Sequence, residues 1–179
     1  MPEAKPSSPS LLKAALVGIV IFAGLLFLIT AMNTEDLLWF WPVFKEIPVN
    51  IIVHCYGMDV EIKPGQPAFE VVNNAVNRSL TGTKRWDDLS MSDVTYQDYQ
   101  TSPTMMTIEL VYDPPVSIHS QYAFFKDVNR LIIPLDGRHA EVNAVFGRTG
   151  GFTNSGSYHV GSTAPIVTAL KEQGVCSKP

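Results

Sequence analysis

Cys55 and Cys176 are the two cysteines of the sequence and its first candidates for chemistry. They form no C-x-x-C motif, which excludes a paired-cysteine metal site and a thioredoxin-like redox centre. A disulfide between them would close a loop of about 120 residues and stabilise the fold by up to ~4–5 kcal/mol in the chain-entropy model. Because the sequence does not fix whether the two Cα atoms approach within ~7 Å, two separate thiols are the alternative.

The four histidines, at positions 54, 119, 139 and 159, are the next candidates. No two of them have the i, i+4 or short-loop spacing of a metal site. Ser120 directly follows His119, and neighbours on an extended chain point to opposite sides, so these two residues do not form a catalytic pair. The sequence also lacks a G-x-S-x-G nucleophile elbow. We therefore expect neither an enzyme nor a bound metal or cofactor.

Aspartates and aromatic residues gather in residues 86–125, which contain no lysine or arginine. A patch of one charge sign can steer an oppositely charged protein, so this segment is a candidate face for a basic partner. The alternatives are a solvated loop and a calcium site, although the close D-x-D-x-D spacing of a calcium loop is missing. The candidate face consists of Trp86, Asp87, Asp88, Asp93, Tyr96, Asp98 and Tyr99.

Length and charge narrow the possible functions further. The chain has 179 residues, 46% of them hydrophobic, and a formal net charge of −4. A nucleic-acid-binding protein needs a basic face to meet phosphate, so we expect no nucleic-acid partner. Residues 43–179 are enough for one domain with a hydrophobic core and too few for two ordinary domains.

Residues 11–32 predict a transmembrane helix. Residues 14–32 carry no charge, and with Leu11 and Leu12 they approach the ~20 residues that cross a hydrocarbon core of ~30 Å. A cleaved signal peptide is the alternative, although its apolar core usually has only ~7–15 residues. Lys5 and Lys13 lie before the apolar stretch and two acids follow it, so the positive-inside rule places the N-terminus in the cytoplasm and the remainder outside.

Short segments flank this helix. Residues 1–10 contain three prolines and three serines and predict a flexible cytoplasmic tail. Residues 33–46 predict an interfacial linker, because aromatic side chains concentrate where a membrane meets water. The expected membrane-interface residues are Trp39, Phe40 and Trp41, which could instead form a docking surface for another membrane subunit.

Residues 47–176 predict an extracytoplasmic α+β domain with a mainly antiparallel sheet. Period-two alternation of apolar residues predicts strands, and near-helical spacing predicts helices. The expected order is ββα-ββββ-α, with both helices on one face of the sheet. Pro134 indicates an edge strand, because proline cannot donate a hydrogen bond to a ladder. The expected strands are 49–56, 58–62, 106–112, both arms of a hairpin over 130–146 that turns at 136–137, and 158–160, and the expected helices are 67–80 and one that begins near Pro165 and ends at Gly174.

Three classes of function fit such a protein. The leading expectation is a non-catalytic, single-pass accessory or assembly subunit of a larger membrane complex, in contact with the lipid bilayer and other integral membrane subunits. The alternative is a membrane-tethered binding or sensing module with a pocket in the sheet near the glycine-rich loop 147–156, whose small-molecule ligand the sequence leaves unknown. An enzyme is the third class, which only a cleft of titratable groups would favour.

Overall fold

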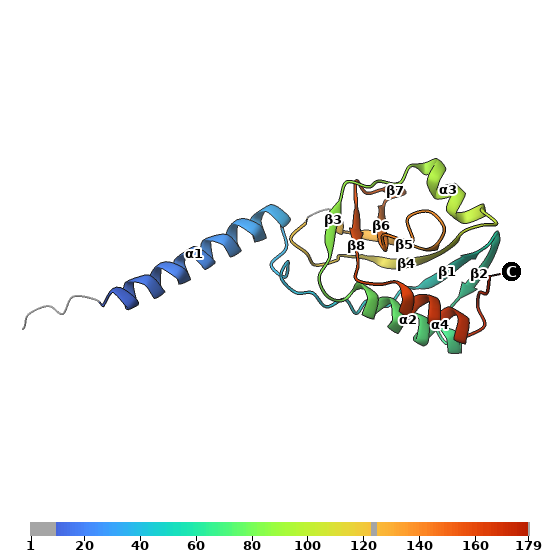
Figure 1. The fold of residues 1–179 in the computed structure, drawn as a ribbon, viewed down its shortest axis with the longest axis horizontal. Coiled ribbons are helices and arrows are strands. Elements are labelled where there is room, and N and C mark those ends of the chain that lie inside the picture. Colours follow the sequence, from blue (N-terminus) through green and yellow to red (C-terminus); the bar gives the residue numbers. More distant parts are fainter. Residues whose placement is uncertain (1–9, 123–124, 179) are drawn as a thin grey trace, which may run out of the picture.

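The first helix stands apart from the rest of the chain. The computed structural model describes residues 10–122 and 125–178. The predicted tail 1–10 therefore lies outside the described residues, apart from Ser10, whose side chain caps this helix. α1 (Leu11–Thr34) then projects away from the domain as a single straight element (Figure 1).

α1 has 24 residues and continues two residues beyond its predicted end at position 32. Only Ala31 and Thr34 of this helix are buried, so α1 takes no part in the hydrophobic core. Its length and apolar composition suit a membrane anchor or a signal sequence alike.

The described strands form one antiparallel sheet of eight strands. Their spatial order is β2-β1-β4-β5-β6-β8-β3, and β7 pairs with β6 off this path. The α+β class and the mainly antiparallel sheet that the sequence predicted are therefore confirmed. The strands are β1 (Asn50–Cys55), β2 (Met58–Ile62), β3 (Arg85–Asp87), β4 (Met106–Val116), β5 (Val128–Asp136), β6 (Ala144–Thr149), β7 (Phe152–Thr153) and β8 (Ser157–His159).

The main hydrophobic core lies on one face of this sheet. Ile51, Val53 and Cys55 alternate along β1 and are all buried in this core. α2 (Pro67–Leu80) and α4 (Ala164–Glu172) contact each other and cover the same face (Figure 1). The apolar face of the strands thus packs against the apolar faces of two helices, as the sequence predicted.

α3 (Asp93–Thr101) covers the opposite face and is an additional helix beyond the two that the sequence predicted (Figure 1). Ser92 caps this helix by accepting a hydrogen bond from the backbone N–H of Thr95 at 3.1 Å. Tyr99 is 1% exposed and belongs to a second core cluster that includes Phe146. The domain therefore has three layers: α2 with α4, the sheet, and α3.

The predicted order of elements is wrong in detail, because β3, α3 and β7 are missing from it. β3 has three residues and β7 has two, which is too short for a period-two pattern to develop. The turn predicted at 136–137 is also longer, since β5 ends at Asp136 and β6 begins only at Ala144.

Pro134 lies in β5, a central strand, so the edge position predicted for it is wrong for the strand as a whole. The ladder between β5 and β6 ends at Ile132, however, and Pro134 pairs with Thr107 of β4 next to a register shift. One side of β5 therefore has no neighbouring strand at Pro134, and a residue without an N–H is tolerated there.

Candidate functional site

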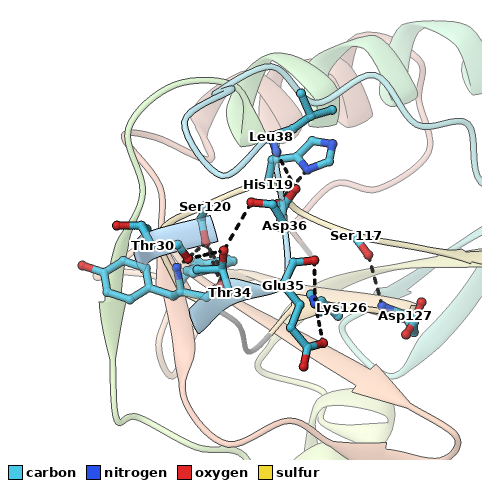
Figure 2. A network of polar contacts seen from close by, with 12 residues as sticks. Thr30, Thr34, Glu35, Asp36, Leu38, Ser117, His119, Ser120, Lys126 and Asp127 are labelled. Atoms are coloured by element: carbon cyan, nitrogen blue, oxygen red, sulfur yellow. Dashed lines mark hydrogen bonds and ion pairs between the residues drawn. The ribbon is translucent and has the colours of Figure 1, made fainter. Parts of the chain in front are cut away.

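A hydrogen bond and an ion pair join the end of α1 to the domain (Figure 2). Asp36 Oδ2 lies 2.9 Å from His119 Nδ1, and Glu35 Oε2 lies 3.0 Å from Lys126 Nζ. His119 and Lys126 both come from the segment between β4 and β5. The end of α1 is thus held against a loop that is distant in sequence, and we call this contact region the junction.

The way α1 ends positions these two acids. Glu35 adopts a left-handed backbone with φ of 48°, which stops the helix. Asp36 then accepts a hydrogen bond from the backbone N–H of Leu38 at 2.8 Å. Lys126 also donates to the main-chain carbonyl of Glu35 at 3.1 Å, where the helix dipole favours a cation. These contacts connect the end of α1 to the loop between β4 and β5.

Trp39, Phe40 and Trp41 are termed the aromatic foot. The ring of Phe27 in α1 packs against Trp39 and Phe40, with centroid separations of 6.2 and 5.9 Å. Trp41 is 51% exposed. The structure thus places the foot beside the final turns of α1, and its contact with a membrane interface stays a prediction.

Cys55 and Cys176 are bonded in the structure, with Cα atoms 5.8 Å apart, rather than being separate thiols. Cys55 ends β1, and Cys176 follows α4. The backbone N–H of Val175 donates to the carbonyl of Leu170 at 2.9 Å, which turns the chain back toward the sheet. The disulfide therefore ties the C-terminal segment to the first strand of the domain.

The acidic and aromatic segment does not form one uniform face. Tyr99 is 1% exposed and belongs to the core, so it is unavailable to a partner. Asp93 lies 3.4 Å from Arg148, and Asp87 lies 3.5 Å from His159, so bases from other strands reach the segment. Trp86, Asp87 and Tyr96 are half-buried. The binding of a basic partner stays a prediction for the exposed members, Asp88, Asp93 and Asp98.

A buried polar network that the sequence analysis missed lies between α3 and the sheet. Glu109 of β4 is 0% exposed. Its carboxylate lies 2.7 Å from Arg130 Nη1 and 3.1 Å from His54 Nε2. From α3, Tyr96 donates its hydroxyl at 3.1 Å and Gln100 donates its amide at 3.2 Å. The carboxylate of Glu109 in β4 thus gathers groups from three other elements, β1, β5 and α3.

The charges in this network support each other. Burial acts to lower the pKa of His54, but hydrogen bonds and the charges of Glu109 and Asp59 outweigh burial and raise the pKa above its ordinary 6.5. Burial acts to raise the pKa of Glu109, but His54 and Arg130 outweigh it and hold the pKa below its ordinary 4.5. Since the members satisfy one another, we assign the network to the positioning of α3.

The remaining histidines lie in separate places. His119 is at the junction, His139 contacts the hydroxyl of Tyr99, and His159 lies beside Asp87. Within residues 10–122 and 125–178, no group of three or more histidine, cysteine or acidic side chains has the arrangement of a metal site.

Half of the glycine-rich loop predicted at 147–156 belongs to strands. β6 continues to Thr149, and β7 follows directly after a turn. A Cβ atom at Gly147 would lie 3.0 Å from the ring of Phe125, so that ring packs closely against the backbone at Gly147.

A groove of about 650 Å³ lies between the linker and α2. Residues 43–47 form one wall, and a polar stripe of α2 forms the other. Asn77 connects the walls by donating to the carbonyl of Glu46 at 3.1 Å. Asn73 is 3% exposed, and its Oδ1 has no hydrogen-bond partner among the described residues. A buried polar atom without a partner costs about 1–3 kcal/mol, which an occupant of the groove could offset.

Comparison of the chain with protein families, with curated proteins and with solved structures found no match. Function must therefore be inferred from the residues and contacts of the chain itself.

Proposed function

We propose that this protein is a non-catalytic, single-pass membrane subunit that supports the assembly of a larger membrane complex. In this proposal α1 is retained as an anchor, the N-terminus is cytoplasmic and the domain lies outside. Lys13 is the only charged residue of α1, and it lies near the start of the helix, where its long side chain can reach lipid headgroups. The contacts of Glu35 with Lys126 and of Asp36 with His119, at the other end of α1, would orient the domain above the membrane.

The groove between the linker and α2 is the observation that carries this proposal. One of its walls belongs to the segment that leaves the anchor, so a neighbouring membrane protein could reach it. Ile47 in that wall is 69% exposed, whereas Asn73 is buried with an unpaired acceptor. A protein segment that covered Ile47 and donated an N–H to Asn73 would remove both unfavourable features.

A binding or sensing module is the second candidate, and the same groove favours it. Its volume of about 650 Å³ falls within the ~300–1,000 Å³ that small-molecule sites usually have. The two candidates differ in the occupant: a protein segment for the subunit, and a small molecule for the sensor.

Isolation of the full-length protein in a mild detergent is expected to bring integral membrane proteins with it in fixed stoichiometry. A photo-crosslinking residue placed at Ile47 should form an adduct with one of these proteins, because Ile47 lines the groove. The same residue placed at Phe152, which is 77% exposed on β7, is the matched control and should form little adduct. Mass spectrometry of the purified complex and of the adducts provides the measurement.

A monomeric protein without adducts at Ile47 would contradict the subunit proposal. If such a protein instead retained a small molecule, and the Asn73→Leu variant lost that molecule, the result would favour the sensing module over the subunit.

A further inference from the structure

A second pocket, of about 210 Å³, lies between the aromatic foot and the turn that connects α2 to β3. Trp39 and Phe40 line one side of it, and Lys84 lines the other. A water molecule occupies ~30 Å³ in the liquid, so the pocket has room for a group several times larger. The remaining polar side chains of the lining are Thr83, His119, Ser120 and Gln121.

Lys84 carries a buried charge without an acidic partner. Its residue is 9% exposed, and Nζ donates to the carbonyls of Gly82 at 3.2 Å and Pro42 at 3.4 Å. The ammonium has three N–H donors, and the third has no acceptor among the described residues. No carboxylate of those residues pairs with it, and burial lowers the pKa of Lys84 to about 8. Buried charges are ordinarily paired, so this cation lacks an anion.

Trp39 lines the same pocket and carries a second donor without a partner in the described part of the chain. Its indole Nε1 is buried and has no acceptor among the residues that the structure describes. A buried indole N–H usually finds a hydrogen-bond partner. The pocket thus combines a cation and a neutral N–H, and the group that would satisfy both is an anion with several acceptor oxygens.

The position of the pocket indicates where such an anion comes from. A helix of 24 residues is about 36 Å long, about 6 Å more than the hydrocarbon core of a bilayer. The last turn of α1 would therefore reach the headgroup layer. Because Trp39 packs on Phe27 of α1, the foot and the pocket behind it would lie at that level.

We propose that this pocket binds the phosphate group of a phospholipid in the outer leaflet, with the Lys84 ammonium and the Trp39 indole N–H as its donors. The inference rests on the membrane anchoring through α1 that is part of the proposed function. The lipid phosphate would neutralise the buried cation and fasten the foot to the membrane surface.

The test follows the indole ¹H–¹⁵N signal of Trp39 in the delipidated full-length protein, held in a maltoside detergent. Short-chain phosphatidylglycerol should shift this signal saturably, whereas the signal of Trp86, outside the pocket, should stay in place. Lys84→Gln should weaken binding by roughly tenfold or more, because a hydrogen bond to a charged group is lost. Lys84→Arg should retain binding, and so should the control Lys63→Gln, whose lysine side chain is 64% exposed.

Two further titrants separate the possible sources of the effect. Inorganic phosphate should bind much more weakly than the lipid, and a short-chain alkyl glucoside should leave the Trp39 signal unshifted. If Lys84→Gln does not fold, Trp39→Phe keeps the ring and removes the donor, and lipid binding to it is then read from ³¹P line broadening, which should decrease.

Three outcomes would overturn the proposal. Saturation by inorganic phosphate at equal concentration would show that the pocket binds a free anion. An equal shift with the glucoside would show that apolar contact, and not the phosphate, causes the shift. The absence of any shift would show that the pocket does not bind the lipid. Since lipid binding needs no protein partner, a protein that purifies alone yet shows the shift would refute the subunit role and leave the lipid site in place.

Discussion

Replacing Cys55 and Cys176 together with alanine is expected to lower the free energy of unfolding by about 5 kcal/mol in the chain-entropy model. The disulfide spans a sequence separation of 121, and its removal frees that long loop in the unfolded chain. Urea unfolding of the full-length protein in detergent, followed by near-ultraviolet circular dichroism, measures the change.

Reduction of the wild-type protein distinguishes the stabilising effect of the disulfide bond from that of the buried sulfur atoms themselves. A thiol reductant should lower the unfolding midpoint of the wild type toward that of the double alanine variant and leave the variant unchanged. Equal midpoints for the oxidised wild type and the variant would show that the bond does not form. Its formation requires an oxidising compartment, which agrees with a domain outside the cytoplasm.

Glu109→Gln is expected to lower the free energy of unfolding by about 3 kcal/mol, because it leaves the charges of His54 and Arg130 without their carboxylate. The value lies at the low end for a buried ion pair, since the side chain of Arg130 is 37% exposed. Glu61→Gln is the matched control. Glu61 is 52% exposed in its pair with Lys63, and a surface pair contributes only ~0–1 kcal/mol. Similar losses for the two variants would contradict a buried network.

The pH dependence of stability provides a second readout of Glu109→Gln. The raised pKa of His54 means that its contribution is complete below 6.5 and is lost as pH rises through the folded-state pKa. The lowered pKa of Glu109 means that its contribution is complete above 4.5 and is lost as pH falls through the folded-state pKa. The network should therefore contribute most between these two pH values. Removing Glu109 should flatten both sides of the profile, and an unchanged profile would refute the assigned contacts.

The elements that the sequence predicted well are those whose pattern is local. Ile51, Val53 and Cys55 alternate along β1, and the structure buries all three. α2 begins at Pro67 and ends at Leu80, as predicted, because proline suits the first turn and the apolar stripe defines the rest. In both cases the signal lies within one element and needs no knowledge of its neighbours.

Glu109 shows why the second layer was missed. It alternates with the apolar residues of β4, and a charged residue in that position normally indicates a solvent-exposed face. The face is buried only because α3 covers it. Tyr96 and Gln100, four residues apart on one side of α3, both bond Glu109 and were the available signal, together with the cap at Ser92.

The junction and its pocket could not be predicted for a related reason. Asp36 and His119 are 83 residues apart. Lys84 lies near the foot because the carbonyl of Pro42 accepts hydrogen bonds from two groups, the Lys84 ammonium and the backbone N–H of Gly82. No periodicity or motif in the sequence indicates contacts between residues that are so far apart along the chain. They depend on how the linker returns across the end of α2.

Protease treatment of sealed membrane vesicles of known orientation, after a carbonate wash, tests most directly whether α1 spans a bilayer and holds the domain outside. The full-length protein should stay in the washed membranes. Protease should digest residues 43–179 only from the extracytoplasmic side and leave a fragment that contains α1. Release of the intact chain by carbonate, or digestion of the domain only from the cytoplasmic side, would contradict the anchored arrangement.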